Sequence, residues 1–272
     1  MSFDPLESIL IVFQNPAEGK QDMYDDWYTN VHIRDAMRLD GAIATQRFIR
    51  APEQLVLNGK PVAPAYWAHT IYEWESAAKS VEGHTNRAGT PLMEITRDCE
   101  FKNLRDYFFR PVFLSHGWSR ESGFRRGSNI LTALIVPPKA GDAAFIDWFQ
   151  NQHAPDTLAL GGFGSIGLFS LHEEQSLPHP FHFPLVAIYA LTDRAAALRN
   201  WAARHDAGSS HDLSAQANEV EIGCWQPRIA RLLASDVLTP PPAALAEETR
   251  ARELYAGNYF TQAELGDLLF GG

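Results

Sequence analysis

Two segments of this sequence carry the same side chains at the same spacing, and these side chains could transfer a proton. Residues 26–35 read DWYTNVHIRD and residues 147–156 read DWFQNQHAPD. In each segment a histidine precedes an aspartate by three residues, a spacing that places both on one face of a helix. A carboxylate that binds one imidazole nitrogen makes the other nitrogen more basic, as a general base near neutral pH requires. The candidate catalytic residues of the two segments are His32, Asp35, His153 and Asp156.

A structural role for the two histidines is the alternative. Pro155 follows His153 by two residues, and proline is tolerated only in the first turn of a helix. The main helix of each segment is therefore expected to end near its histidine, where an imidazole can bind the last carbonyl groups. Retention of both histidines favours this alternative, because two diverged domains rarely keep two active sites.

Two further residues distinguish the first copy from the second. Tyr28 corresponds to Phe149, and a hydroxyl in only one copy is what a single working site needs, although drift would leave the same difference. His69 lies in a predicted strand on the same face as Trp67, and its counterpart is Val186. An ionisable group on a strand that is buried on both faces is costly without a partner. Tyr28 and His69 are therefore candidate catalytic residues, with a satisfied core histidine as the alternative for His69.

Other side chains are suited to binding a substrate, and none is suited to binding a metal. For the tryptophans of the two segments, burial in the core is the alternative. His84 is expected at the surface. Histidines in residues 172–182 lack cysteine or carboxylate partners at metal spacing, so no metal site is predicted. Neither a glycine-rich nucleotide motif nor a GxSxG motif is present. The candidate substrate-binding residues are Trp27, Arg47, Trp67 and Trp148.

The two segments belong to a duplicated domain. Without a gap, residues 9–48 align with residues 130–169, including the pairs Gly41/Gly162 and Phe48/Phe169. Hydrophobic periodicity predicts the order β-α-β-β-α-β in each copy, which is the ferredoxin-like unit. The expected boundaries are 1–115 for the first ferredoxin-like repeat, 116–127 for a linker, 128–234 for the second repeat and 235–272 for a C-terminal helical tail. We expect the tail to pack across both domains or against a neighbouring subunit.

The first strand of each copy has no polar face, since residues 9–13 read ILIVF and residues 130–136 read ILTALIV. A sheet that is apolar on both sides must be covered on both sides. The predicted fold class is therefore α+β, with the two ferredoxin-like domains packed as one barrel within the chain. Residues 9–48, with the apolar strand, the NPAEG turn, the DWYTNVH helix and the closing QRF, resemble the dimeric α+β barrel superfamily, in particular EthD-like proteins.

This resemblance implies a small pocket that uses His, Tyr and Asp side chains on apolar, often aromatic, substrates. The superfamily includes cofactor-free monooxygenases, cyclases, isomerases, lyases and haem enzymes. We expect a cofactor-independent enzyme that moves a proton on a small apolar or aromatic carbonyl or phenolic compound, with the first repeat as the working half. An oxygen-using enzyme, either cofactor-free or with haem on a histidine, is one alternative, and a non-catalytic binding protein is another.

Charge and composition limit the partners. The net charge of −10 argues against nucleic acid and anionic membranes, which need a basic surface. Residues 1–5 show no signal peptide and no segment is apolar enough to span a membrane, so a cytoplasmic protein is expected. Cys99 and Cys224 are expected to be buried and free rather than disulfide-bonded. A small-molecule substrate is the expected partner, and the chain is expected as a monomer or a homodimer.

Overall fold

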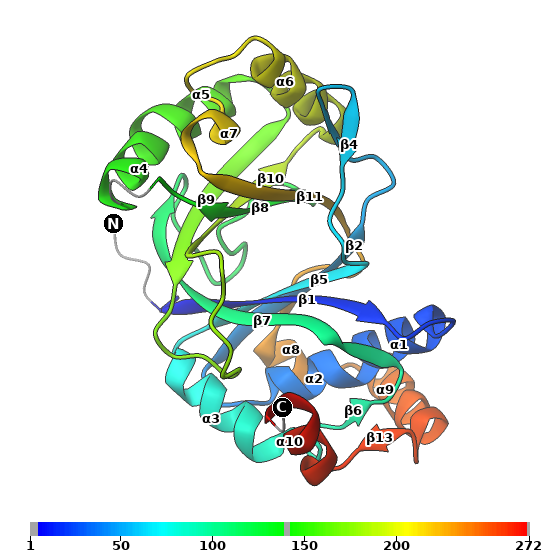
Figure 1. The fold of residues 1–272 in the computed structure, drawn as a ribbon. Coiled ribbons are helices and arrows are strands. Elements are labelled where there is room, and N and C mark those ends of the chain that lie inside the picture. Colours follow the sequence, from blue (N-terminus) through cyan, green and yellow to red (C-terminus); the bar gives the residue numbers. More distant parts are fainter. Residues whose placement is uncertain (1–4, 139–141, 271–272) are drawn as a thin grey trace.

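The computed structural model describes residues 5–138 and 142–270, which form a closed antiparallel barrel with helices on its outside (Figure 1). Four strands of the barrel come from each half of the chain. The first half supplies β1 (Ser8–Pro16), β2 (Ala42–Arg50), β5 (Ala68–Trp74) and β7 (Cys99–Leu114). The second half supplies β8 (Asn129–Val136), β9 (Phe163–Leu171), β10 (Leu185–Leu191) and β11 (Glu219–Pro227).

Both halves have the ferredoxin-like strand order. The sequence of neighbours is β7-β1-β5-β2 in one half and β11-β8-β10-β9 in the other, which is fourth, first, third, second in each. The sheets join edge to edge, because β7 pairs with β9 and β11 pairs with β2. Closure leaves none of these eight strands as a free edge. Two ferredoxin-like domains that form one barrel within the chain are thus confirmed.

Helical segments cover the outside of each half. The first half has α1 (Gln21–Trp27), η1 (Tyr28–His32), α2 (Ile33–Met37) and α3 (Ala77–Arg87). The second has α4 (Asp142–Trp148), η2 (Phe149–His153), α5 (Ala154–Ala159), α6 (Arg194–Asp206) and the short α7 (Leu213–Gln216). A hairpin of β3 (Leu55–Leu57) and β4 (Lys60–Val62) turns at Asn58-Gly59, where both residues have positive φ.

The apolar side chains form three cores, and the strands alternate between them. In β1, Ile9, Ile11 and Phe13 point into the barrel, whereas Leu10 and Val12 pack beneath the helices of the first half. The second half has its own outer core under α4 to α6. The barrel core and the outer cores use opposite faces of the same strands, which explains why these strands carry no polar face.

The helix that carries each histidine does not end there. Tyr28–His32 and Phe149–His153 form π-helical turns, and α2 and α5 continue directly from them. Backbone angles stay helical through the junction, with φ −61° and ψ −45° at His32. The predicted C-terminal position of the two histidines is therefore wrong. A π turn accommodates one extra residue without ending the helix, so neither histidine lies at a terminal carbonyl group.

The segment after β11 packs on the first half, and it leaves the second half a few residues before the expected start of the tail at 235. It contains β12 (Leu232–Leu233) beside β2, α8 (Ala234–Leu238), α9 (Pro242–Tyr255) against η1, β13 (Tyr259–Phe260) paired with β6 (Ile95–Thr96), and α10 (Gln262–Phe270). The expectation that it spans both domains is wrong. Ion pairs and strand pairing hold it on the first half. The arginines of α9 bind carboxylates of the first helical segment, for instance Arg250 with Asp26 at 2.8 Å.

The expectation that Cys99 and Cys224 are buried and free is confirmed. Thr261 and Glu264 form a capping box at the start of α10, with the Thr261 amide donating to the Glu264 carboxylate at 2.8 Å. Every helix in the part of the chain that the structure describes is too short or too polar to cross a lipid bilayer.

The duplicated glycines offer a matched test of the packing between helix and strand. Gly41 and Gly162 have φ of +82° and +86°, so alanine at either position costs about 1 kcal/mol in backbone strain. A Cβ at Gly162 would also lie 2.5 Å from the Ala197 amide nitrogen, whereas the nearest atom at Gly41 is 3.8 Å away. We expect Gly162→Ala to lower the free energy of unfolding clearly more than Gly41→Ala in urea titrations. Equal losses would show that α6 can move aside.

Candidate functional site

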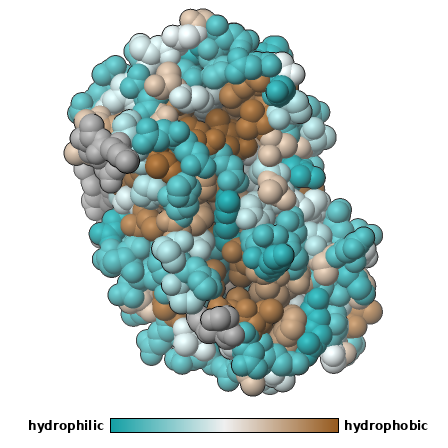
Figure 2. All heavy atoms as spheres, in the orientation of Figure 1, coloured by the Kyte–Doolittle hydropathy of each residue, from teal (hydrophilic) through white to brown (hydrophobic). Residues whose placement is uncertain are grey.

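A cavity of about 330 Å³ lies in the first half, between the outer face of the barrel and its helices. Strands β1, β5 and β7 form one side, η1 and α3 form the next, and α10 closes the outside. Hydrophobic atoms gather at the surface beside the C-terminal end, in the region of α10 (Figure 2). A small apolar cavity with a few polar groups is the usual form of a small-molecule site. The apolar lining includes Leu10, Val12, Trp27, Met93, Ile95, Phe101, Leu104 and Leu265.

Several polar side chains line this cavity, among them Tyr28, His32, Tyr72 and Asp106, with Ser176 beside Asp106. The Tyr72 hydroxyl donates a hydrogen bond of 3.2 Å to the Tyr28 hydroxyl. Nδ1 of His32 and Oδ1 of Asp106 are buried and have no hydrogen-bond partner within the described residues. Buried polar atoms in proteins are nearly always paired, so unpaired ones in a cavity are available to a ligand.

The cavity shifts the pKa values of these groups in different directions. Loss of hydration raises the pKa of the Asp106 carboxyl to about 7. Burial raises the pKa of Tyr28, so its phenol stays protonated. Burial lowers the pKa of His32 to about 3, and its ring stacks on Trp27 with centroids 4.9 Å apart. The predicted increase in the basicity of His32 is therefore wrong, and Asp106 is the group that titrates near neutral pH.

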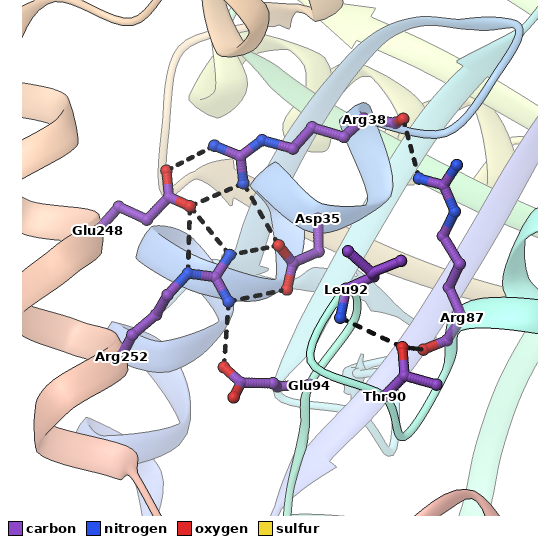
Figure 3. A network of polar contacts seen from close by, with 8 residues as sticks. All are labelled: Asp35, Arg38, Arg87, Thr90, Leu92, Glu94, Glu248 and Arg252. Carbon is purple, nitrogen blue, oxygen red and sulfur yellow. Dashed lines mark hydrogen bonds and ion pairs between the residues drawn. The ribbon is translucent and has the colours of Figure 1, made fainter.

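Asp35 does not bind His32. Its carboxylate pairs with Arg252 of α9 and, at 3.3 Å, with Arg38 (Figure 3). Glu248 of α9 joins the same network through a bond of 2.7 Å with Arg38. The predicted His32–Asp35 pair is wrong because two guanidinium groups compete for this carboxylate. The network attaches the tail to the helix that carries the cavity residues.

Arg47 and Trp67 lie behind the cavity and do not line it. The guanidinium of Arg47 is fully buried and donates to the carboxylate of Asp25 and, at 3.0 Å, to the hydroxyl of Thr29. Its central carbon lies 4.5 Å from the ring centroid of Tyr28 and 5.6 Å from that of Trp67. These cation–π contacts hold the Tyr28 ring in place. Arg47 is thus a support for Tyr28, and the expected contact of Arg47 and Trp67 with substrate is not seen.

His69 points into the barrel and away from the cavity. Its ring stacks on Phe13 with centroids 4.3 Å apart, and Nδ1 lies 3.1 Å from the carbonyl oxygen of Val12. Trp67 packs on the opposite side with the helices, so the predicted shared face is wrong. Trp67 precedes the regular strand, which begins at Ala68, and the alternation of side chains does not extend to it. The position of His69 is that of a core histidine.

The corresponding space in the second half is filled. His153 is fully bonded, with Nδ1 2.7 Å from the carbonyl oxygen of His211 and Nε2 2.9 Å from the Tyr189 hydroxyl. Trp201 is fully buried against Tyr189, with centroids 4.9 Å apart. Trp148 packs on His153 at 5.2 Å in the same core. These side chains occupy the volume that stays open in the first half.

Asp156 does not hold His153 either. Its carboxylate lies 3.4 Å from a guanidinium nitrogen of Arg204 and 3.4 Å from Nδ1 of His211. The i, i+3 spacing therefore does not produce a His–Asp pair in either copy. In each copy an arginine from another helix binds the aspartate, and the histidine turns inward.

Sequence reasoning missed Asp106 and misplaced His84. His84 was expected at the surface, but it lines the cavity with its ring edge on Trp74 at 5.8 Å. The strand registers make Ile222 the counterpart of Asp106, because Asp106 lies opposite Val12 as Ile222 lies opposite Ala133. Asp106 gave little signal in the sequence, because β7 also carries Glu100, Lys102, Arg105 and Arg110.

Metal binding finds no support here. No group of three or more His, Cys, Asp or Glu side chains among residues 5–138 and 142–270 could hold a metal ion. A haem group also fits poorly, because its two propionates need cationic partners and the described lining of the cavity contains neither Arg nor Lys.

Comparisons with known proteins agree on the fold. No known protein-family profile matches the sequence, and no curated protein matches it. Among solved structures, an anthrone oxidase-like protein has a TM-score of 0.57 at 14% identity, covering 89% of this chain and 99% of that one. This chain has the dimeric α+β barrel fold. The resemblance drawn from the sequence is thus confirmed for the fold, with both halves of the barrel in one chain.

Two further dimeric α+β barrel structures match over similar lengths. A protein assigned as a monooxygenase from Fusobacterium nucleatum subsp. nucleatum has a TM-score of 0.50 at 9% identity, covering 84% of this chain and 95% of that one. A mutant chlorite dismutase from Candidatus Nitrospira defluvii has a TM-score of 0.50 at 9% identity, covering 88% and 98%. Identities this low establish the fold alone.

The buried histidines give the protein a defined acid sensitivity. Burial lowers the pKa of His32, His69 and His153 to about 3, whereas an unfolded histidine titrates near 6.5. Below pH 6.5 the unfolded chain therefore binds protons that the native state does not bind, and stability falls as the pH drops toward 3. His69→Val, which copies Val186 of the second half, should be less stable than wild type at pH 8.

That deficit should shrink by about 2 kcal/mol at pH 5, because the variant has one histidine fewer to keep neutral. Urea unfolding of both proteins at pH 8 and pH 5 measures the difference directly. A deficit that stays constant over this range would mean that native His69 takes up a proton as readily as an unfolded histidine.

Proposed function

We propose that this protein is a cofactor-independent enzyme that abstracts a proton from a small apolar or aromatic carbonyl or phenolic compound in the cavity of the first half. The observation that carries the proposal is the Asp106 carboxyl, with a pKa of about 7, facing the Tyr28–Tyr72 hydroxyl pair across an apolar space. A group with this pKa is half ionised at neutral pH, where general-base catalysis is most effective.

Asp106 takes the role of base. Its desolvated carboxylate can accept a proton from an acidic C–H or phenolic O–H group of a bound compound. Hydration is missing around it, so the carboxylate is a stronger base than an exposed aspartate. His32 is uncharged, and the cavity thus holds one group that becomes anionic near pH 7 beside neutral donors.

The tyrosine pair stabilises the anion that remains on the substrate. Tyr72 donates to Tyr28, which leaves the proton of Tyr28 free to be donated to an enolate or phenolate oxygen. The guanidinium of Arg47 against the Tyr28 ring favours this donation through its positive charge. Fixed donors aimed at developing negative charge account for large rate enhancements in many enzymes.

Two variants test the role of Asp106 before a natural substrate is known. Proton abstraction in D₂O exchanges the acidic hydrogen of a bound compound, and NMR of a panel of aromatic ketones and phenols detects this exchange. We expect Asp106→Asn to lower the exchange rate by about a hundredfold or more. His69→Val should keep the rate, because His69 faces the barrel.

Asp106→Asn should also change how the free energy of unfolding depends on pH. In wild type, folding binds a proton at Asp106 between pH 4 and pH 7, so the stability contributed by this site falls as the pH rises through that range. At pH 8 the native state carries the cost of the buried charge, and Asp106→Asn should be as stable as wild type or more stable. Loss of exchange together with loss of folding would not support the proposal.

Helix α10 closes the cavity and is expected to control entry. Leu265 is 5% exposed and lines the cavity, whereas Leu268 on the same helix is 50% exposed and does not. Leu265→Ser should weaken binding of compounds from the panel about tenfold or more, as expected when a buried apolar contact is replaced by a polar group. Leu268→Ser, measured alongside by fluorescence titration, should leave binding unchanged. Equal effects would show that α10 does not form the cavity wall.

A second candidate function is a cofactor-free oxidation. It is favoured by the fold similarity at a TM-score of 0.57 to the anthrone oxidase-like protein. The first step is the same, because removal of a phenolic or enolic proton gives an electron-rich anion that can react with O₂. Turnover that stops under nitrogen while D₂O exchange continues would support this function, and oxygen-independent turnover would support isomerisation or elimination.

The unpaired polar atoms distinguish both candidates from a binding protein. A carrier for apolar compounds needs only apolar walls, whereas this cavity leaves Oδ1 of Asp106 and Nδ1 of His32 without partners among the described residues. Keeping such groups in a buried site is costly to folding and is typical of active sites.

A further inference from the structure

A second cavity, of about 580 Å³, lies where the linker before β8 folds over the junction of β2 and β11. It shares no lining residue with the first cavity. Three arginines, Arg125, Arg228 and Arg231, face it, and Glu121 is the one acidic residue in its described lining. This concentration of positive charge stands out in a chain with a net charge of −10.

Arg125 is buried without hydrogen-bond partners. Its side chain is 4% exposed, and none of its three nitrogens has a partner within the described residues. Its central carbon lies 5.4 Å from the ring centroid of Phe48 and 5.3 Å from that of Phe124, so aromatic rings flank the guanidinium. Cation–π contacts offset part of the lost hydration. They do not satisfy the five N–H donors, which require acceptors.

The nearest carboxylate is already used by other groups. Glu73 lies 3.7 Å from Arg125, beyond hydrogen-bond distance. Its oxygens accept bonds of 3.0 and 2.7 Å from Arg231 and one of 2.7 Å from the indole of Trp118. One carboxylate therefore serves two guanidinium groups. The arrangement leaves one buried positive charge without a counter-charge of its own.

We propose that this second cavity is a binding site for an oxyanion, with Arg125 as its principal ligand. A guanidinium presents paired N–H groups that match the two oxygens of a carboxylate or of a phosphate group. Ser122, Ser128 and Gln46 line the same space with further polar groups. Arg228 stands at its rim with its side chain 45% exposed, and its Nε pairs with Asp25 at 2.6 Å, which leaves its other nitrogens for a ligand. The expected ligand is a small molecule that carries a carboxylate or a phosphate.

The test measures the melting temperature of the full chain with added anions. Sodium phosphate and sodium succinate are compared with sodium chloride at equal ionic strength. A ligand that binds only the native state raises Tm in a saturable way. We expect a rise of a few degrees for wild type with phosphate, succinate or both, and the anion with the larger effect identifies the chemical class of the ligand. Chloride should give no saturable rise.

Three variants locate the effect. Arg125→Met should lose the anion-dependent rise and keep the melting temperature without anion, because an apolar side chain of similar length replaces an unpaired charge. Arg228→Gln, at the exposed rim, should weaken the apparent affinity several-fold, and Arg47 still pairs with the Asp25 carboxylate that Arg228 releases. Arg204→Met is the matched control, since Arg204 is also buried with unpaired nitrogens but lies outside this cavity. It should keep the full rise.

Two results would overturn the proposal. The first is a wild-type Tm that responds to phosphate and succinate no more than to chloride, which would mean that water satisfies Arg125. The second is an unchanged anion response in both Arg125→Met and Arg228→Gln, which would place the anion elsewhere. D₂O exchange in the first cavity is a separate measurement, so failure of this proposal leaves the proposed function untouched.

Discussion

The structure depends on one constraint, which is that each four-stranded sheet is apolar on both faces. Closure of the barrel buries one face of each sheet, and helices must cover the other. The space under these helices can differ between the two halves without disturbing the barrel. In the second half Trp201 fills that space, and in the first half His84 stands at the equivalent helix position and leaves it open. The candidate site exists because the outer core of the first half is packed less completely than that of the second half.

The outer core of the first half differs from that of the second half in its polar side chains as well as in its open volume. Tyr28 and Asp106 of the first half stand where the second half has Phe149 and Ile222. A carboxyl with a pKa raised to about 7 is an unfavourable feature of a folded core. The tail compensates for part of this cost. Its ion pairs with the first helical segment and its α10 helix over the cavity hold the first half together where its own packing is incomplete.

The sequence predicted the fold well because the relevant signals are periodic and occur twice. The barrel followed from first strands without a polar face, and β1 and β8 are buried along nearly their whole length. The site was predicted only in part. The i, i+3 rule places His32 and Asp35 on one face, but arginines from a distant helix capture the aspartate, and no local pattern reports that. Asp106 was missed because it is one of several charged residues in β7 and has no chemical partner at a recognisable spacing.

In the first cavity the Asp106 carboxyl, with a pKa of about 7, lies with a neutral His32. The most direct measurement is NMR of the aspartate side-chain carboxyl carbons and the histidine rings from pH 4 to pH 9. We expect an aspartate with a midpoint near pH 7 that is absent in Asp106→Asn, and a His32 ring that remains unprotonated down to pH 4, as do His69 and His153 elsewhere in the protein. Titration of Asp106 below pH 5, or protonation of His32 near pH 6.5, would contradict this expectation.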